Sequence, residues 1–427
     1  MSILLKDIKE IYSPNQDLNM FNHVIITDRK IDKILKEIDI DKHNFDKIID
    51  CRNKVVLPGL INNHTHSSMS ILRGYADDLV LDKWLKDKIW PAEAKLTEKD
   101  IYWGAMLAVL EMIKTGTTTF TDMYFHMDKV AEVVEKSGIR AVLGEGLIEE
   151  NDGLEGLNNS LEFALEYNNK AEGRIKTCMA PHSAYTCTPE YLKEVSNAAL
   201  ENDLLVNIHV SETEDEVNII KDNYNTTTVQ LLEDIGLLDN DIIAPHCVYV
   251  NDKDIKLLKK KNVGVVYNPS SNMKLSSGIA PISELLDNDI NVSYGTDSAA
   301  SNNNLDLIEE ARIGSYLQKV STGDPRVLPI EANLKMLTLN AAQIIGYSNL
   351  GEIKEGYLAD LVLIDTKNIP HQYPSYNYLS NIFYAGNGGD VDTVIVNGEV
   401  LMENRKLITI DEQEVYKNIN KISKKYL

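Results

Sequence analysis

Two histidines separated by a single residue, His64 and His66, have the types and the spacing that point most directly to chemistry. They stand in Pro58-Gly-Leu-Ile-Asn-Asn-His-Thr-His66, directly after the apolar run 54–57. Residues i and i+2 of a β-strand lie on the same face, so both imidazoles would leave the strand end side by side. Two neutral imidazoles can supply half of the inner shell of a metal ion. A lone His-x-His is often accidental, so this hypothesis requires further ligands, a base and a pocket.

The missing ligands are predicted at the ends of two later β-type runs. His209 ends the run 204–209, and Asp297 follows Tyr294-Gly-Thr. Together with His64 and His66 they would form a mononuclear shell of three imidazoles and one carboxylate, which suits Zn²⁺ and is also acceptable to Fe²⁺ or Mn²⁺. The shell leaves room for one water, whose pKa would fall to about 7 on Zn²⁺.

A hydrolytic metal site also needs groups that carry protons. Glu212 lies three residues after His209, at a predicted junction between strand and helix, and we assign it the general acid/base role. His246 ends another β-type run in Ala244-Pro-His246 and is expected to polarise the attacking water or the developing oxyanion. Asp297 could both bind the metal and accept a proton. Each of these residues taken alone is more often an ordinary hydrogen-bonded residue at a strand end.

The elements that must position these residues form a repeating pattern of β-type runs and helix-type segments. The helix-type segments include 97–114, 189–201 and 305–320, and eight β-type runs are predicted at 55–60, 117–121, 140–143, 175–180, 204–208, 241–244, 263–267 and 291–294. This alternation predicts an α/β fold with a (β/α)₈ barrel, whose active site lies at the carboxyl ends of the strands. Five of the nine histidines follow such ends, namely His64, His66, His182, His209 and His246. A doubly wound sheet would bind at one switch point and would not explain this spread.

The two ends of the chain have a different pattern. Residues 1–55 alternate short β-type runs with charged turns, and so do the runs 361–365 and 393–398. We predict that residues 1–55 and 356–427 pair into one small β-sandwich beside a barrel of residues 56–355, with a terminal helix that begins near residue 411.

Composition limits the classes of partner. The chain has 427 residues, 43% of them hydrophobic and 25% charged, with a formal net charge of -22. Such a negative field would repel nucleic acid and anionic membranes, so we expect neither as a partner. The N-terminus has no apolar signal segment and no run is apolar enough to span a bilayer. The four cysteines form no CxxC pair, so we predict a cytoplasmic protein with reduced cysteines.

The chain resembles the amidohydrolase superfamily, and within it the 5'-methylthioadenosine/S-adenosylhomocysteine deaminase branch. Eight segments carry the resemblance, at residues 58–69, 72–79, 88–93, 115–124, 180–187, 209–213, 268–281 and 295–304. The resemblance implies one divalent metal, most often zinc, on His64, His66, His209 and Asp297. It also implies that Glu212 transfers protons to a purine ring, with His246 beside the hydrolytic water.

The same resemblance implies a nucleoside substrate and a homo-oligomer. Glu93 would bind the ribose hydroxyls and His182 the nucleoside, and we expect Ser301 and Trp84 to contact the substrate as well. The implied reaction is hydrolytic deamination of adenosine, 5'-deoxyadenosine or 5'-methylthioadenosine, with S-adenosylhomocysteine as a further candidate. Members that use S-adenosylhomocysteine tend to carry two arginines, where this chain has Glu145 and, roughly, Leu157. Glu145 is expected to repel a carboxylate, so a neutral 5'-group is predicted.

Two other functions stay open at this point. The first is a different amidohydrolase, such as a guanine or cytosine deaminase or a triazine hydrolase, whose metal site would look much the same. The second is a barrel without catalysis that serves as a scaffold. Such a scaffold would be expected to lose metal ligands or the base, whereas this chain retains His64, His66, His209, Glu212, His246 and Asp297.

Overall fold

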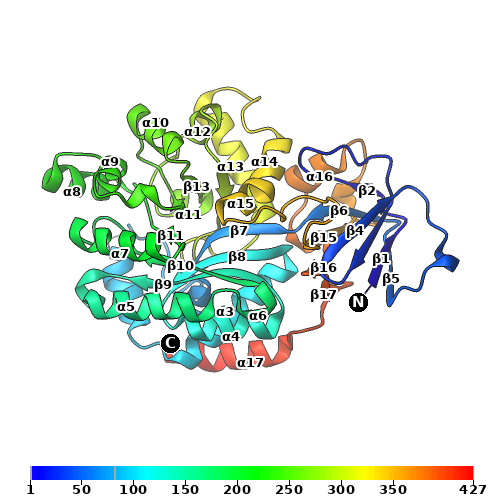
Figure 1. Cartoon of the computed structure of the whole chain (residues 1–427), viewed down its shortest axis with the longest axis horizontal. Helices are drawn as coiled ribbons and strands as arrows, with labels where there is room; N and C mark the ends of the chain where they lie inside the picture. The colour runs from blue at the N-terminus through cyan, green and yellow to red at the C-terminus, as the bar shows by residue number, and fades with distance from the viewer. Residues whose placement is uncertain (1, 81–82, 427) are drawn as a thin grey trace.

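The computed structural model describes residues 2–80 and 83–426, and its largest sheet confirms the predicted barrel (Figure 1). The strands of this sheet are parallel and lie in sequence order, so each strand pairs with its neighbour along the chain. They are β7 (Leu60–Thr65), β8 (Thr117–Tyr124), β9 (Arg140–Leu147), β10 (Ile175–Pro181), β11 (Leu205–Asn207), β12 (Ile242–Pro245), β13 (Gly264–Tyr267) and β14 (Val292–Tyr294).

Helices follow these strands along the chain and surround the barrel in Figure 1. Several begin at the residues that the sequence indicates: Thr97 forms a capping box with Asp100 before α3, and Thr188 caps α7. The helices between β7 and β15 are α2 (Trp90–Glu93), α3 (Glu98–Lys114), α4 (Met127–Ser137), α5 (Glu149–Tyr167), α6 (Lys170–Gly173), α7 (Pro189–Glu201), α8 (Glu214–Tyr224), α9 (Thr228–Asp234), α10 (Asp252–Lys260), α11 (Pro269–Lys274), α12 (Ile282–Asp287), α13 (Leu307–Thr322), α14 (Ile330–Leu337) and α15 (Leu339–Ile344). A 3₁₀ segment, η2 (Ser67–Leu72), and a π-helical segment, η3 (Trp84–Ile89), follow β7.

Both chain ends build the predicted β-sandwich beside the barrel. One sheet has the order β4 (Lys30–Leu35), β3 (His23–Thr27), β1 (Ser2–Lys6) and β5 (Lys47–Asp50). The other has the order β18 (Lys406–Leu407), β17 (Glu399–Glu403), β16 (Val391–Val396), β15 (Leu361–Asp365), β6 (Lys54–Pro58) and β2 (Glu10–Ile11). Apolar residues of both sheets, including Ile3, Val24 and Leu363, pack into one buried core.

The first predicted barrel strand, 55–60, is wrong. Residues Lys54–Pro58 form β6 of the sandwich, and the barrel begins only with β7 at Leu60. Gly59 lies between the two strands. Glycine is required there because a Cβ atom would lie 2.1 Å from the hydroxyl oxygen of Thr118. The other seven predicted runs each overlap an observed barrel strand.

A buried ion pair joins the sandwich to the barrel. Arg140, at the start of β9, donates two hydrogen bonds to Asp360, which directly precedes β15, at 2.9 and 3.0 Å. Both side chains are almost completely buried. Because the two charges lie in different layers of the fold, their pairing fixes how the layers meet.

The terminal helix returns to the barrel. Helix α17 (Glu412–Ile422) begins after the capping residue Asp411 and packs on α3, where Lys114 pairs with Glu412 at 2.8 Å. The remaining helix of the C-terminal part is α16 (Tyr378–Tyr384).

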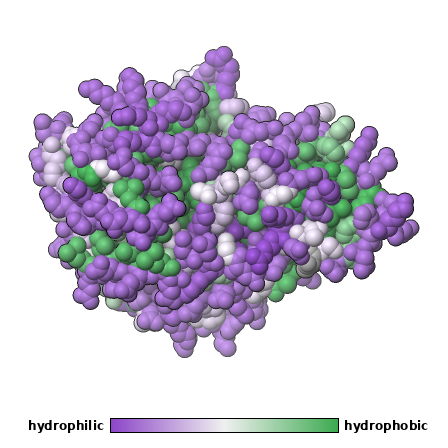
Figure 2. Space-filling model, viewed as in Figure 1, coloured by the Kyte–Doolittle hydropathy of each residue, from purple (hydrophilic) through white to green (hydrophobic). Residues whose placement is uncertain are grey.

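The surface agrees with the acidic composition. Figure 2 shows a mainly hydrophilic face, with hydrophobic side chains both at the sandwich end and around α5 and α7 of the barrel. In residues 2–80 and 83–426, no helix combines the length and the apolar character needed to cross a membrane. The cysteines are free and buried, as predicted, at Cys51, Cys178, Cys187 and Cys247.

Candidate metal centre

Closure of the barrel brings two predicted metal ligands together. The backbone N–H of Asp297, just beyond β14, donates to the carbonyl oxygen of His64 on β7 at 3.0 Å. The Asn62 side chain fastens the same seam by two hydrogen bonds to Thr296, at 2.8 and 3.0 Å. Gly295 permits the close approach, because a Cβ atom there would lie 2.7 Å from that of His64. Contacts between the first and last barrel strands therefore bring His64 and Asp297 together, although they are far apart in the sequence.

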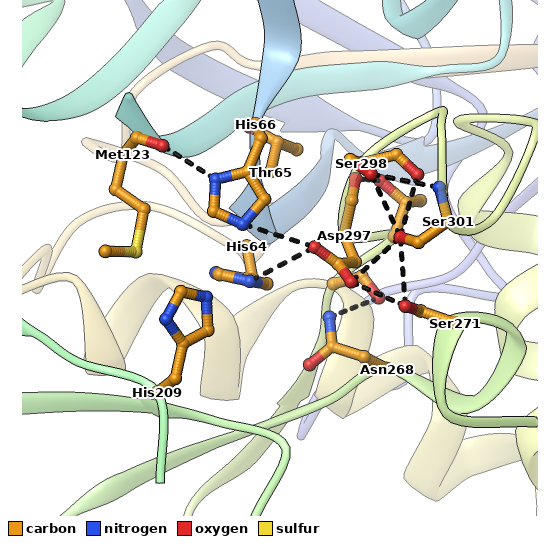
Figure 3. Close-up of polar contacts among 12 residues, drawn as sticks. His64, Thr65, His66, Met123, His209, Asn268, Ser271, Asp297, Ser298 and Ser301 are labelled. Atoms are coloured by element: carbon orange, nitrogen blue, oxygen red, sulfur yellow. Dashed lines mark hydrogen bonds and ion pairs between the residues drawn. The ribbon is translucent and has the colours of Figure 1, made fainter. Parts of the chain in front are cut away.

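Backbone carbonyls orient two of the imidazoles. Nδ1 of His66 lies 2.7 Å from the carbonyl oxygen of Met123, and Nδ1 of His209 lies 2.7 Å from that of His182. A carbonyl oxygen only accepts, so Nδ1 must carry the proton in both rings. Each Nε2 is left with a free lone pair that faces the centre (Figure 3). This arrangement is typical of metal-binding histidines.

His64 lies at the bottom of the site. Its side chain is fully buried, and burial lowers its pKa to about 3, so the ring is neutral. Neither ring nitrogen has a hydrogen-bond partner among the described residues. A buried polar atom without a partner is costly, and a metal ion would provide one.

Asp297 completes the set of oxygen and nitrogen donors. Its Oδ1 lies 3.4 Å from Nε2 of His64 and 3.3 Å from Nε2 of His66. Its Oδ2 accepts hydrogen bonds from Ser271 at 2.5 Å and Ser301 at 3.0 Å (Figure 3). Burial opposes ionisation of this carboxyl, but the proximity of the His64, His66 and His246 imidazoles holds its pKa well below the usual range. The carboxylate is therefore ionised, as a ligand must be.

These distances fit a single divalent ion. The donor atoms of His64, His66 and His209 all lie within 4.8 Å of one another, and so do those of His64, His246 and Asp297. Three neutral imidazoles and one ionised carboxylate are the donor set that zinc prefers. The chain's own residues therefore fit a metal, on the evidence of the unpartnered nitrogens and of the ring orientations.

Glu212 and His246 form a second pair beside this centre. Their closest atoms, Oε2 and Nε2, lie 3.7 Å apart, and Nδ1 of His246 bonds to Oδ1 of Asn272 at 2.8 Å. Burial raises the pKa of Glu212. Burial would lower the pKa of His246, but the carboxylates of Glu212 and Asp297 raise it. A carboxyl and an imidazole held this close, with perturbed pKa values, are candidates for an acid/base pair.

A cavity of about 750 Å³ opens above the centre. The five predicted substrate contacts all line it: Trp84, Glu93, His182, Glu212 and Ser301. Trp84 comes from the π-helical segment η3, where its indole N–H donates to the carbonyl oxygen of Ala76 at 3.1 Å. Tyr124 donates to Glu93 at 2.5 Å, and Nδ1 of His182 lies 3.0 Å from the hydroxyl oxygen of Thr186. The size suits a small molecule.

Sequence reasoning missed several residues that hold these groups. Asp122, at the end of β8, accepts hydrogen bonds from the Thr65 hydroxyl at 2.9 Å and the backbone N–H of Ser67 at 2.8 Å, on either side of His66. Ser271 and Asn272 come from the segment after β13. Two signals could have suggested them: Asn268-Pro-Ser-Ser-Asn272 is polar and directly follows a buried strand, and it belongs to the segment 268–281 that carries the family resemblance.

The expected role of Glu145 is wrong. Its carboxylate accepts the backbone N–H groups of His126 at 2.9 Å and Met127 at 3.0 Å, and so caps α4. It does not line the cavity, and neither does Leu157. The acidic lining on this side comes instead from Glu150 and Asp152, at the start of α5.

Comparisons with known proteins point to one family. A family model described as the amidohydrolase family matches residues 55–401. A 5-methylthioadenosine/S-adenosylhomocysteine deaminase from Halothermothrix orenii is 51% identical over 431 residues, which cover 100% of both chains. A 5'-deoxyadenosine deaminase from Methanosphaera stadtmanae is 46% identical over 416 residues, 97% of this chain and 96% of that protein. The crystal structure of an adenosine deaminase from Xanthomonas campestris with bound zinc has a TM-score of 0.94 at 30% identity and covers 99% of this chain and 98% of its own.

Proposed function

This chain belongs to the amidohydrolase family, and on that premise we propose that it deaminates adenine nucleosides by hydrolysis. The products would be the inosine analogue and ammonia. One observation carries the proposal: the donor set of His64, His66, His209 and Asp297 adjoins the proton-exchanging pair Glu212 and His246 at one end of a nucleoside-sized cavity. The names of relatives that match almost the whole chain support it.

We assign the metal site to His64, His66, His209 and Asp297. Three imidazoles and a carboxylate suit zinc and are also acceptable to Fe²⁺ or Mn²⁺; we propose zinc because the adenosine deaminase from Xanthomonas campestris contains it. When bound, such an ion supplies Lewis acidity, which lowers the pKa of a coordinated water to about 7. Elemental analysis of the purified protein tests this assignment, and less than half an equivalent of any divalent metal in fully folded protein would contradict it.

Glu212 and His246 provide the proton transfers. Deamination adds the elements of water at C6 of the purine, so one proton must reach the ring nitrogen N1 and another the departing amino group. Glu212, with its raised pKa, takes a proton from the attacking water and delivers it to N1. His246 keeps Nε2 toward Glu212 because Asn272 holds Nδ1, so it stabilises the carboxylate after each transfer. The hydroxyl formed at C6 then gives up its proton through Glu212 to the amino group, which leaves as ammonia while the C6–N bond breaks and the ring carbonyl of the inosine analogue forms.

The far side of the cavity binds the sugar. Glu93 presents a half-buried carboxylate, to whose Oε1 Tyr124 donates, so that Oε2 can accept from ribose hydroxyls. His182 lies beside His209, with ring centroids 4.8 Å apart, and contacts the nucleoside between the metal side and the cavity wall. Trp84 covers the site with a rigid apolar surface against which a base or a sugar can pack.

We further propose that the 5'-group of the preferred substrate is neutral. Among the described residues that line the cavity there is no lysine or arginine, whereas Glu150 and Asp152 stand on the wall beside α5. A phosphate or a free carboxylate in this position would gain no charge-assisted hydrogen bond and would meet negative charge. Adenosine, 5'-deoxyadenosine and 5'-methylthioadenosine satisfy this condition.

The test is ammonia release from zinc-loaded protein. Adenosine, 5'-deoxyadenosine and 5'-methylthioadenosine are compared with S-adenosylhomocysteine, adenosine 5'-monophosphate, guanine and cytosine. We expect the highest kcat/KM on the three neutral nucleosides. Activity confined to guanine or cytosine would refute the nucleoside assignment, and a faster reaction with the phosphate or with S-adenosylhomocysteine would refute the neutral 5'-group.

A further inference from the structure

A second carboxylate, Glu216, lies directly behind the proposed acid/base Glu212. It belongs to the first turn of α8 and its side chain is buried, with only 2% of its surface exposed. Its two oxygens accept separate backbone hydrogen bonds, from the N–H of Ser211 at 2.9 Å and from the N–H of Glu212 at 2.8 Å. The carboxylate therefore closes the turn that carries Glu212.

The backbone conformation of this turn requires stabilisation by groups outside it. Ser211 has a φ of 50°, in the left-handed region that a non-glycine residue rarely adopts. Ser211 is buried and Glu212 is half-buried, so their backbone N–H groups have little access to water and require acceptors in the protein. A carboxylate accepts such bonds more strongly than a neutral group, because the bonds are charge-assisted.

The same turn also anchors the segment that carries His246. The carbonyl oxygen of Ser211 accepts the N–H groups of Val248 at 3.1 Å and Tyr249 at 3.0 Å, and the N–H of Cys247 donates to Val210 at 2.9 Å. His246 itself has a φ of 76°, so its backbone too is held in an unfavourable conformation. A chain of hydrogen bonds thus runs from Glu216 through Ser211 to the residues that follow His246.

Capping of α8 does not explain the side chain of Glu216. The capping residue of this helix is Thr213, whose hydroxyl accepts the backbone N–H of Glu216 at 3.2 Å. That bond uses only the main chain of residue 216 and would survive any substitution there except proline. The buried carboxylate must then serve the turn and not the helix.

We propose that Glu216 is a positioning residue that holds Glu212 and His246 in the geometry for proton transfer. The inference rests on the proposed function, because it assigns a purpose to the hydrogen bonds only if Glu212 moves protons. It predicts that loss of the carboxylate slows the chemical step without weakening the binding of metal or nucleoside, since Glu216 lines neither site.

The test compares Glu216→Gln with Glu214→Gln, an exposed glutamate of the same helix turn. Glutamine has one acceptor oxygen, and its NH₂ group would meet an N–H donor, so one of the two backbone bonds is lost. For Glu216→Gln we expect kcat on 5'-deoxyadenosine to fall at least tenfold, with KM and zinc content within twofold of wild type. The control variant should retain the kcat of wild type.

Two further variants separate positioning from general damage. Ser211→Gly adopts a positive φ without strain, so adding it to Glu216→Gln should recover part of the lost kcat. Glu216→Asp retains a carboxylate at a shorter reach and should fall between wild type and Glu216→Gln; it also provides a test if the glutamine variant does not fold.

The outcomes distinguish this inference from the proposed function. Wild-type protein that releases no ammonia from any nucleoside would refute the proposed function and this inference with it. Active wild type together with an unchanged kcat in Glu216→Gln would refute the inference alone. A parallel loss of kcat, zinc and thermal stability that Ser211→Gly does not relieve would show a structural role and would equally overturn it.

Discussion

Substitution of Ser271 by alanine should weaken metal binding without altering the nucleoside site. The hydroxyl of Ser271 donates to Oδ2 of Asp297 at 2.5 Å, while Oδ1 of the same carboxylate faces the imidazoles. Ser271 does not line the cavity, in contrast to Ser301, which provides the other hydrogen bond to Oδ2. The variant therefore perturbs the orientation of a ligand and leaves the substrate contacts in place.

The magnitude follows from one lost charge-assisted hydrogen bond. Such a bond contributes about 1.5–3 kcal/mol. The bond from Ser301 remains, so Asp297 stays ionised but rotates more freely. Since about 1.4 kcal/mol corresponds to a factor of ten, the Kd for zinc should rise about 10- to 100-fold, which is the range usual for residues that orient metal ligands.

The assay is competition for zinc between the protein and a chromophoric chelator, with the KM for 5'-deoxyadenosine measured at saturating zinc. Ser270→Ala is the matched control, because the neighbouring hydroxyl of Ser270 is buried, whereas the hydroxyl bonds to Asp297 come from Ser271 and Ser301. If Ser271→Ala and Ser270→Ala bind zinc with the same affinity, the hydrogen bond to Asp297 does not stabilise the metal site and the reasoning is wrong.

Three more predictions concern proton transfer and stability. Glu212→Gln should lower kcat about 10²- to 10⁴-fold with zinc content unchanged, and a loss of activity that merely follows loss of zinc would contradict its acid/base role. Burial raises the pKa of Glu310 to about 8, so the folded state retains a proton that the unfolded state releases above about pH 4.3. The free energy of unfolding should therefore fall as the pH rises from about 4.3 to 8, less steeply in Glu310→Gln; equal slopes in urea titrations would refute this. Arg140→Met should cost about 3–5 kcal/mol by leaving the buried charge of Asp360 unpaired, and the double variant Arg140→Met/Asp360→Leu should recover most of that loss in the same titrations.

The barrel, and the proximity of the candidate metal ligands, could be predicted because both depend on short-range pattern. Strand periodicity alone puts His64 and His66 on one face, and alternation of strands and helices alone suggests a barrel whose strand ends converge. The boundary at Gly59 could not be predicted in this way, because the residues on both sides of it are equally apolar. The spatial neighbour Thr118 explains why glycine stands at this boundary, since a Cβ atom there would clash with it.

The residues that orient the candidate metal ligands and His246 could not be predicted from sequence pattern. Ser271 acts on Asp297 across the gap between β13 and β14, and Asn272 acts on His246 from a strand end that does not carry it. Such contacts depend on the tilt and register of the closed barrel, which single-sequence spacing does not contain. The error over Glu145 has the same origin: its position near the end of β9 could be foreseen, but the N-terminus of α4 that it caps could not.

The two halves of the metal site are held by different kinds of contact, and this difference has a consequence for substitution. The imidazoles of His66 and His209 are oriented by main-chain carbonyls, which any side chain at residues 123 and 182 would still present. Asp297 is instead oriented by the hydroxyl groups of Ser271 and Ser301, each of which can be removed by one substitution. The orientation of His66 and His209 thus depends on the register of the barrel strands. Cavity-lining residues such as Met123 and His182 can therefore be substituted to suit a different substrate while both imidazoles stay oriented. The carboxylate and the turn that carries Glu212 depend on individual side chains, and substitutions there should alter catalysis before they alter the fold.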